Sequence, residues 1–164
     1  MKAPAVVLAA LLVLHASAHA TAQIPDEILI NGERASLFTE PFSTYLLATD
    51  SVKKLEPFLH RHPCSGSWRG HVAFWEVRAD KLVLAKLVAN PCDEKPKEIP
   101  LATFFPGQDG PIPATWYSGR LVVPQGKMAR YVHMGYGSQY ERYIVLIVVN
   151  GAVTERIETQ APPK

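Results

Sequence analysis

Two Asn-Gly pairs constrain the fold of this chain more than any other feature of its sequence. Asn31-Gly32 and Asn150-Gly151 each lie between apolar segments, and both residue types tolerate the positive φ angles of a two-residue hairpin turn. The strands expected beside them are residues 27–30 and 35–38 for the first pair, and residues 140–149 and 152–158 for the second. Ile144–Val149 is apolar throughout, which predicts a strand buried on both faces. The pattern favours an antiparallel sheet.

The remaining segments predict more strands and little helix. Additional strands are expected at residues 70–77, 82–88, 114–123 and 128–134, and loops at residues 90–100 and 108–113. A turn at Ala79-Asp80-Lys81 separates the first two of these strands, and a turn at Pro124-Gln125-Gly126 separates the last two. Apolar side chains recur with helical spacing in residues 42–59, which predicts one interrupted helix or two short ones. We therefore expect an α+β fold, a single domain with a dominant antiparallel β-sheet and one or two short helices packed on it.

The N-terminal segment has the pattern of a secretory signal. Lys2 precedes an apolar run from Ala5 to Leu14, and small residues follow at the positions that a signal peptidase reads. Cleavage is expected before Thr21 or Gln23, because Ala precedes each of them. The division expected is a signal peptide at residues 1–22, a globular α+β domain at residues 23–160 and a tail at residues 161–164. The chain is therefore expected to be periplasmic or secreted in a bacterium.

Charge and length limit the classes of partner. Without the leader, 142 residues remain, with 16 basic and 15 acidic side chains. This near-neutral balance argues against nucleic-acid binding, which needs a basic patch or stripe. No segment after the leader reaches the roughly 18 uncharged apolar residues of a membrane span, so no integral membrane segment is expected. The expected partner is an envelope protein or a glycan.

The two cysteines predict a covalent link. In an oxidising compartment, an even pair such as Cys64 and Cys92 most often forms one disulfide. The alternative is a metal site in which Cys64 joins His60 and His62, since all three are potential ligands. A structural metal site needs a fourth ligand, which the sequence does not identify. The disulfide is favoured, and no metal or cofactor is expected.

Residues 131–143 form the segment richest in chemically versatile side chains. The candidate binding surface consists of Tyr131, His133, Tyr136, Tyr140, Glu141 and Arg142. Alternation along a strand would place Tyr131 and His133 on one face, while Gly135 and Gly137 allow a turn that a ligand can approach closely. Tyr side chains offer contact area at a low entropic cost. The competing interpretation is that the glycines shape a turn and the tyrosines pack on the sheet.

Two other sets of residues contain side chains suited to binding or catalysis. All three tryptophans, Trp68, Trp75 and Trp116, are expected in the core, where aromatic side chains form cross-strand pairs. Glu76 and Glu141 are acids within predicted strands, and a pair of carboxylates at the right separation could hydrolyse a glycoside. Acids in this setting more often pair with a neighbouring arginine, so no catalytic residue is assigned.

The order of several motifs resembles that of a small bacterial family. These motifs are Arg69-Gly70 followed by Trp75-Glu76, Phe105-Pro106, Trp116-Tyr117-Ser118-Gly119 followed by Pro124-Gln125-Gly126, and Tyr131 to Arg142. The resemblance covers most of residues 28–153, and the last motif is the most specific. It implies no activity, and no catalytic or binding residue is carried over from it.

These observations favour an exported, non-enzymatic binding or interaction protein. One alternative is a hydrolase of cell-wall or carbohydrate material that uses Glu76, His133 or Glu141. Another is an inhibitor or structural partner that inserts an exposed loop into a second envelope protein.

Overall fold

The computed structural model describes residues 21–108 and 110–160. The apolar run of the expected signal peptide and the C-terminal tail lie outside these residues. The strands are β1 (Asp26–Ile30), β2 (Glu33–Leu37), β3 (His71–Arg78), β4 (Lys81–Ala89), β5 (Lys97–Ile99), β6 (Ile112–Pro113), β7 (Gly119–Arg130), β8 (Gln139–Val149) and β9 (Ala152–Thr159). The helical elements are α1 (Pro41–Ala48) and two 3-10 turns, η1 (Val52–Phe58) and η2 (Leu101–Thr103). The expected α+β single domain dominated by a sheet is confirmed.

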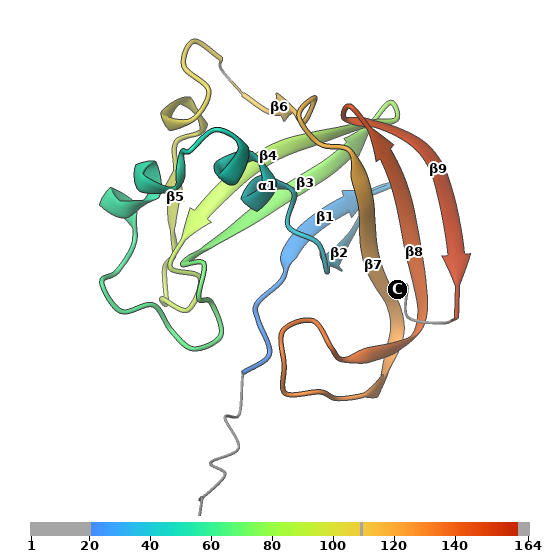
Figure 1. Ribbon diagram of the computed structural model, residues 1–164. Helices are drawn as coiled ribbons and strands as arrows, with labels where there is room; N and C mark the ends of the chain where they lie inside the picture. Colours follow the sequence, from blue (N-terminus) through green and yellow to red (C-terminus); the bar gives the residue numbers. More distant parts are fainter. Residues whose placement is uncertain (1–20, 109, 161–164) are drawn as a thin grey trace, which may run out of the picture.

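The strands form one strongly bent sheet in the order β2-β1-β3-β4-β9-β8-β7, with β5 and β6 also paired to β4 (Figure 1). Its first and last strands meet where the Phe38 N–H donates to the Val122 carbonyl at 2.8 Å. β4 and β9 pair at one position only, Lys81 with Ala152. The result is a barrel-like sheet whose strands diverge on the β4–β9 side. The sheet is mixed rather than purely antiparallel, because β1 and β3 run parallel.

Both Asn-Gly hairpins are present. Asn31 and Gly32 join β1 to β2 with φ angles of 53° and 83°, and Asn150 and Gly151 join β8 to β9 with φ angles of 48° and 79°. These left-handed conformations are the ones that the two residue types tolerate. The middle of β8 is buried on both faces, since neighbouring Val145 and Leu146 are both buried, whereas Val149 at the end of the apolar run is 47% exposed.

The core lies between the concave face of the sheet and the helical segments. Phe42 and Leu46 of α1 belong to the same buried cluster as Leu84 and Leu87 of β4. Aromatic rings join α1 to the segment around η2, with Phe42 and Phe104 at a centroid distance of 5.0 Å. No side-chain hydrogen bond caps the N-terminus of the short helix, so its packing on the core contributes most to holding it.

The expected turn at Pro124-Gln125-Gly126 is wrong, because β7 runs through it as one strand with an irregular register between Gln125 and Met128. Pro124 is tolerated there because β7 is the last strand of the sheet path, so the missing N–H costs no second ladder hydrogen bond. β7 then ends at Arg130, so Tyr131 and His133 lie in the following loop and not on a strand.

Other expectations also change. β5 and β6 lie within segments expected to be loops. Trp75 is buried and Trp116 packs against the core, but Trp68 is 67% exposed, so its assignment to the core was wrong.

The predicted Cys64–Cys92 disulfide is confirmed, with Cα atoms 6.5 Å apart. Because Cys64 is bonded to Cys92, the metal alternative loses its sulfur ligand.

Candidate interaction site

An aromatic recess opens between the loop that joins β7 to β8 and the first residues of the described chain. Its volume is about 150 Å³. The residues that line it are Ala22, Gln23, Pro25, Ser36, Phe38, Met128, Tyr131, Gly135, Tyr136, Ser138 and Tyr140. Phe38 is at its centre, since the ring of Tyr136 stacks on it at 5.2 Å and that of Tyr140 meets it edge-on at 5.7 Å. The recess is much smaller than the 300–1,000 Å³ of typical small-molecule pockets, so its size suits one side chain or one ring.

The 131–138 loop that forms one wall is itself ordered by backbone hydrogen bonds. The Met134 N–H donates to the Val132 carbonyl, and the Gly137 N–H donates to the Met134 carbonyl, each at 2.8 Å. A Cβ atom on Gly137 would lie 3.0 Å from the Met134 oxygen, so a larger residue would be crowded at this position. Gly135 has a φ angle of 48°, in the left-handed region that glycine adopts without strain.

The segment before β1 holds the loop in place. Ala22 forms a parallel bridge with Gly135, and the Gln23 N–H donates to the Gly135 carbonyl at 3.2 Å. The side chain of Gln23 turns the other way, where its Oε1 accepts from the Trp68 N–H at 3.0 Å and its Nε2 donates to the Ser65 carbonyl at 3.1 Å. Gln23 therefore links the loop on one side to residues 65–68 on the other.

A buried ionic network lies under this wall. Arg69 donates to Asp26 Oδ1 at 2.9 Å, its Nε lies 3.2 Å from Glu40 Oε1, and its Nη2 donates to the Tyr136 hydroxyl at 3.2 Å. Tyr136 in turn donates to Glu40 Oε1 at 2.8 Å. We call Asp26, Glu40, Arg69 and Tyr136 the Arg69 network. It ties together four segments that are distant in the sequence, and through Tyr136 it fixes the loop to the barrel.

Asp26 is the most buried member of the Arg69 network, with no exposed surface. Besides Arg69, it accepts hydrogen bonds from the Ala73 N–H and from the Trp75 indole N–H, both at 3.0 Å. Alternation along β1 explains this burial, because Asp26 faces the same side as Ile28, which is also fully buried. A carboxylate on the core face needs several donors, and Arg69 and β3 supply them.

Electrostatics fix the protonation of two neighbouring groups. Burial raises the pKa of Tyr136, so its hydroxyl stays protonated and donates to Glu40. Burial and then the charge of Arg69 lower the pKa of His71 below its usual 6.5, so this histidine is neutral at pH 7. His71 Nδ1 donates to the Arg69 carbonyl at 2.9 Å, while its Nε2 is buried without a partner. The interior beneath the recess is therefore built to stabilise neutral His71 and a charged Arg69.

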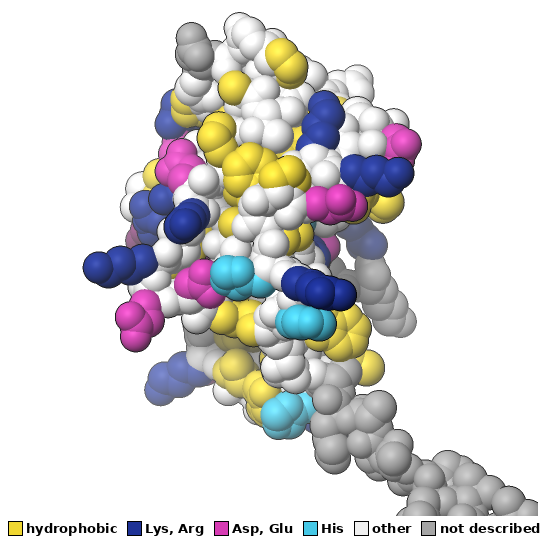
Figure 2. All heavy atoms as spheres, turned by 90° about the vertical axis from the view of Figure 1, so that its left-hand side faces the viewer, with side chains coloured by type: hydrophobic (Ala, Val, Ile, Leu, Met, Phe, Trp, Pro, Cys, Tyr) yellow, Lys and Arg dark blue, Asp and Glu magenta, His cyan; other side chains and the backbone are white. Residues whose placement is uncertain are grey.

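The outer edge of the recess is apolar and exposed. Trp68, Met128, Tyr131 and Met134 have exposed fractions of 67%, 47%, 51% and 63%. We call these four side chains the apolar rim. Met128 and Tyr131 line the recess together with Gln23. Trp68 is joined to Gln23 through its backbone N–H, and Met134 precedes Gly135, whose carbonyl accepts from the Gln23 N–H. Figure 2, which views the molecule from the left of Figure 1, shows hydrophobic side chains and a histidine at its lower end.

The structure brings part of the candidate surface together. Tyr131, Tyr136 and Tyr140 share the recess, and His133 lies beside it with its Nδ1 3.3 Å from the Tyr131 hydroxyl. The hydroxyl of Tyr136 faces the Arg69 network, so this residue positions the loop. Glu141 lies at the β7 irregularity, where its Oε2 accepts from the Lys127 N–H at 2.9 Å. In this segment Tyr136 packs inward, whereas Tyr131 is exposed.

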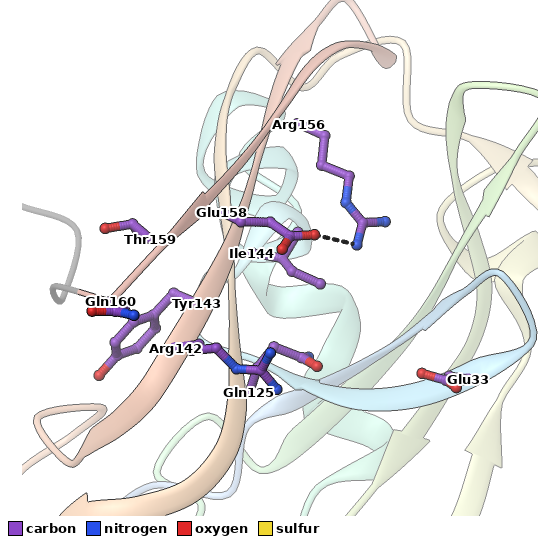
Figure 3. Close-up of a pocket in the computed structure, with 9 residues that line it drawn as sticks. All are labelled: Glu33, Gln125, Arg142, Tyr143, Ile144, Arg156, Glu158, Thr159 and Gln160. Atoms are coloured by element: carbon purple, nitrogen blue, oxygen red, sulfur yellow. Dashed lines mark hydrogen bonds and ion pairs between the residues drawn. The ribbon is translucent and has the colours of Figure 1, made fainter.

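Arg142 is separated from the other candidates. It lines a larger cavity, of about 400 Å³, between β8, β9 and the tip of the β1–β2 hairpin (Figure 3). The other residues that line it are Glu33, Gln125, Tyr143, Ile144, Arg156, Glu158, Thr159 and Gln160. None of them lines the recess.

Glu76, a candidate for hydrolysis, and His60, a candidate metal ligand, each have another partner. Glu76 forms an ion pair with Arg78. His60 Nε2 lies 2.9 Å from Asp93 Oδ2. Within residues 21–108 and 110–160, no group of three or more His, Cys, Asp or Glu side chains is arranged to hold a metal ion.

Sequence reasoning did not identify Gln23, Asp26 or Glu40 as parts of the site. For Asp26 a signal exists, because it is in phase with Ile28 and Ile30 on the apolar face of the predicted strand. Gln23 and Glu40 lie in connecting segments where no periodic pattern marks the direction of a side chain.

Among the described residues, no helix has the length and apolar character needed to cross a membrane. Compared with known proteins, the chain matches no family model, no curated protein and no solved structure.

Proposed function

We propose that this chain is an exported binding protein that docks a protein partner on the apolar rim, with one side chain of the partner entering the aromatic recess. The observation that carries the proposal is the apolar rim itself, in which a tryptophan, a tyrosine and two methionines are all exposed on segments next to the recess. Exposed apolar clusters of this kind mark interaction sites on proteins.

The residue types favour a protein partner over a glycan. Aromatic residues and methionine are enriched in protein interfaces, and Trp and Tyr account for many of the residues that dominate binding energy. Met128 and Met134 offer flexible, polarisable surface that adapts to an apolar partner. A glycan site would instead need several polar groups directed at sugar hydroxyls.

The site is also preorganised. The Arg69 network and the contacts of Gln23 hold the recess walls from below and from the side, so docking does not require the loop to become ordered. Preorganisation reduces the entropic cost of binding and leaves more of the contact free energy as affinity.

The disulfide supports export, and the position of the interaction site is compatible with removal of a leader. A disulfide persists in an oxidising compartment, and Cys64 and Cys92 form one. Cleavage after Ala20 would also leave the interaction site intact, since Ala22 bridges Gly135 and the Thr21 carbonyl accepts from Gln23 Nε2 at 3.2 Å.

Site-specific photocrosslinking in the native host tests the proposal. A photoreactive phenylalanine analogue replaces Tyr131 or Met134, and in the control it replaces Leu47, which is 76% exposed on α1 and outside the apolar rim. We expect one discrete protein adduct at both rim positions and none at Leu47. No adduct at either rim position, or the same adducts at all three positions, would refute the proposal.

A further inference from the structure

We propose that the 400 Å³ cavity beside β8 and β9 binds a short peptide by its free termini, with the C-terminal carboxylate at Arg142 and the N-terminal amine at Glu33. This site is independent of the docking surface proposed above, because the two cavities share no lining residue.

The register of the strands places a polar patch on the concave side of the sheet. Along β7 and β8 the facing pairs Leu121–Leu146, Val123–Ile144 and Gln125–Arg142 follow one another on the same face. The first two pairs belong to or pack against the hydrophobic core, whereas the third lies beyond it. The concave face thus changes from apolar to polar within four residues and continues as the cavity wall.

The β9 side of the cavity is charged but neutralised. Arg156 and Glu158 alternate onto the same face as Ile144, and Arg156 Nη2 donates to Glu158 Oε1 at 3.0 Å. Figure 3 shows both side chains directed toward the space between β9 and the β1–β2 hairpin. Since they satisfy each other, they leave the recognition of a charged ligand to the remaining two groups.

Those two groups are Arg142 and Glu33. In the part of the chain that the structure describes, no carboxylate lies within ion-pairing distance of the Arg142 guanidinium, and no cation lies within that distance of the Glu33 carboxylate. They come from different strands, and Figure 3 shows Glu33 on the hairpin and Arg142 across the cavity from it. The cavity therefore presents one unpaired positive and one unpaired negative group on opposite walls.

This charge pattern selects a dipolar ligand over a simple anion or cation. A guanidinium binds a carboxylate through two parallel hydrogen bonds, and a carboxylate accepts readily from an ammonium group. The amine and the carboxylate of a free amino acid share one carbon, so they cannot reach opposite walls together. A peptide of a few residues separates its termini, and the volume of about 400 Å³ lies within the usual range for small ligands.

Calorimetric titration of the mature protein with trialanine tests this site. We expect saturable binding that weakens at least tenfold in Arg142→Gln and in Glu33→Gln, since each variant removes one charge-assisted contact. N-acetyltrialanine should lose the Glu33 contact and trialanine amide the Arg142 contact, each with a similar loss. The control Arg61→Gln, an exposed arginine outside the cavity, should bind trialanine as the wild type does.

Two results of these titrations would each overturn the proposed peptide site. No heat of binding with trialanine would overturn the proposal. Binding that is equal in the wild type and in Arg142→Gln would overturn it as well, because the carboxylate would then be held elsewhere. Both substitutions are at exposed positions, so we expect them to leave the melting temperature unchanged. An unchanged melting temperature will confirm that the variants are folded.

Discussion

Replacing Asp26 by Asn tests the Arg69 network most sharply. The substitution keeps the size of the side chain but removes its charge and turns one acceptor oxygen into an NH₂ donor. Asp26 accepts from Arg69, Ala73 and Trp75, so at least one of these donors would then face another donor. Arg69 would also lose its shortest ion pair while its side chain stays 85% buried, since its exposed fraction is 15%.

The expected loss in the free energy of unfolding follows from these contacts. Removing one partner of a buried ion pair costs about 3–5 kcal/mol, because the remaining charge is left uncompensated. Glu40 still lies 3.2 Å from Arg69 Nε, so the lower end of that range applies. We expect Asp26→Asn to lower the free energy of unfolding by about 3 kcal/mol, a large part of the ~5–15 kcal/mol of a typical domain.

Urea unfolding at pH 7, followed by tryptophan fluorescence and far-UV circular dichroism, measures this loss. Glu27→Gln is the matched control, since Glu27 is the next residue of β1 and its ion pair with Arg34 is exposed, at 3.4 Å. Such a surface pair is worth at most about 1 kcal/mol. If Asp26→Asn costs no more than Glu27→Gln, the network does not stabilise the fold. Should Asp26→Asn fail to fold, Tyr136→Phe keeps the stacking on Phe38 and should cost ~1–2 kcal/mol.

Three further predictions follow from the structure. Burial and the charge of Arg69 lower the pKa of His71 below 6.5, so as the pH falls the imidazole is protonated in the unfolded chain before it is protonated in the folded one. The free energy of unfolding should therefore decrease below pH 6.5 in the wild type and decrease less in His71→Gln. Urea midpoints between pH 5 and 7 will measure this difference. Replacing Cys64 and Cys92 by Ser should lower the free energy of unfolding by about 3.6 kcal/mol, the loop-entropy value for their separation, and a loss below 1 kcal/mol would contradict this. Mass spectrometry of the exported protein should give a mature chain that begins at Thr21, whereas a start at Gln23 would show that the bridge of Ala22 to the loop is dispensable.

The local parts of this fold could be predicted from the sequence. A hairpin such as β1–β2 depends on two residues at the turn and on apolar segments next to it, all of which are adjacent in the chain. The same local reasoning failed at Pro124-Gln125-Gly126, whose residue types are typical of a turn. There β8 supplies a continuous partner for β7, and this long-range pairing overrides the local preference.

The candidate site could be predicted only in part. The tyrosines of residues 131–140 were identified by their density and by the glycines among them. Which of them is exposed depends on the Arg69 network, whose members Asp26, Glu40, Arg69 and Tyr136 lie far apart in the chain. No periodicity or motif links such residues before the fold is known. Trp68 was assigned to the core because of its residue type, but its backbone is held by Gln23 in a loop, which leaves the indole in solvent.

The affinity of the protein captured at position 134 for variants of the apolar rim tests the proposed function most directly. Trp68→Ser should weaken binding at least about 30-fold, the loss typical of a residue that dominates an interface, with an unchanged melting temperature. Leu47→Ser, at the exposed apolar position on α1, should bind within twofold of the wild type under our proposal. Equal affinity of the wild type and Trp68→Ser, or equal weakening by Leu47→Ser, would contradict an interaction site at the apolar rim.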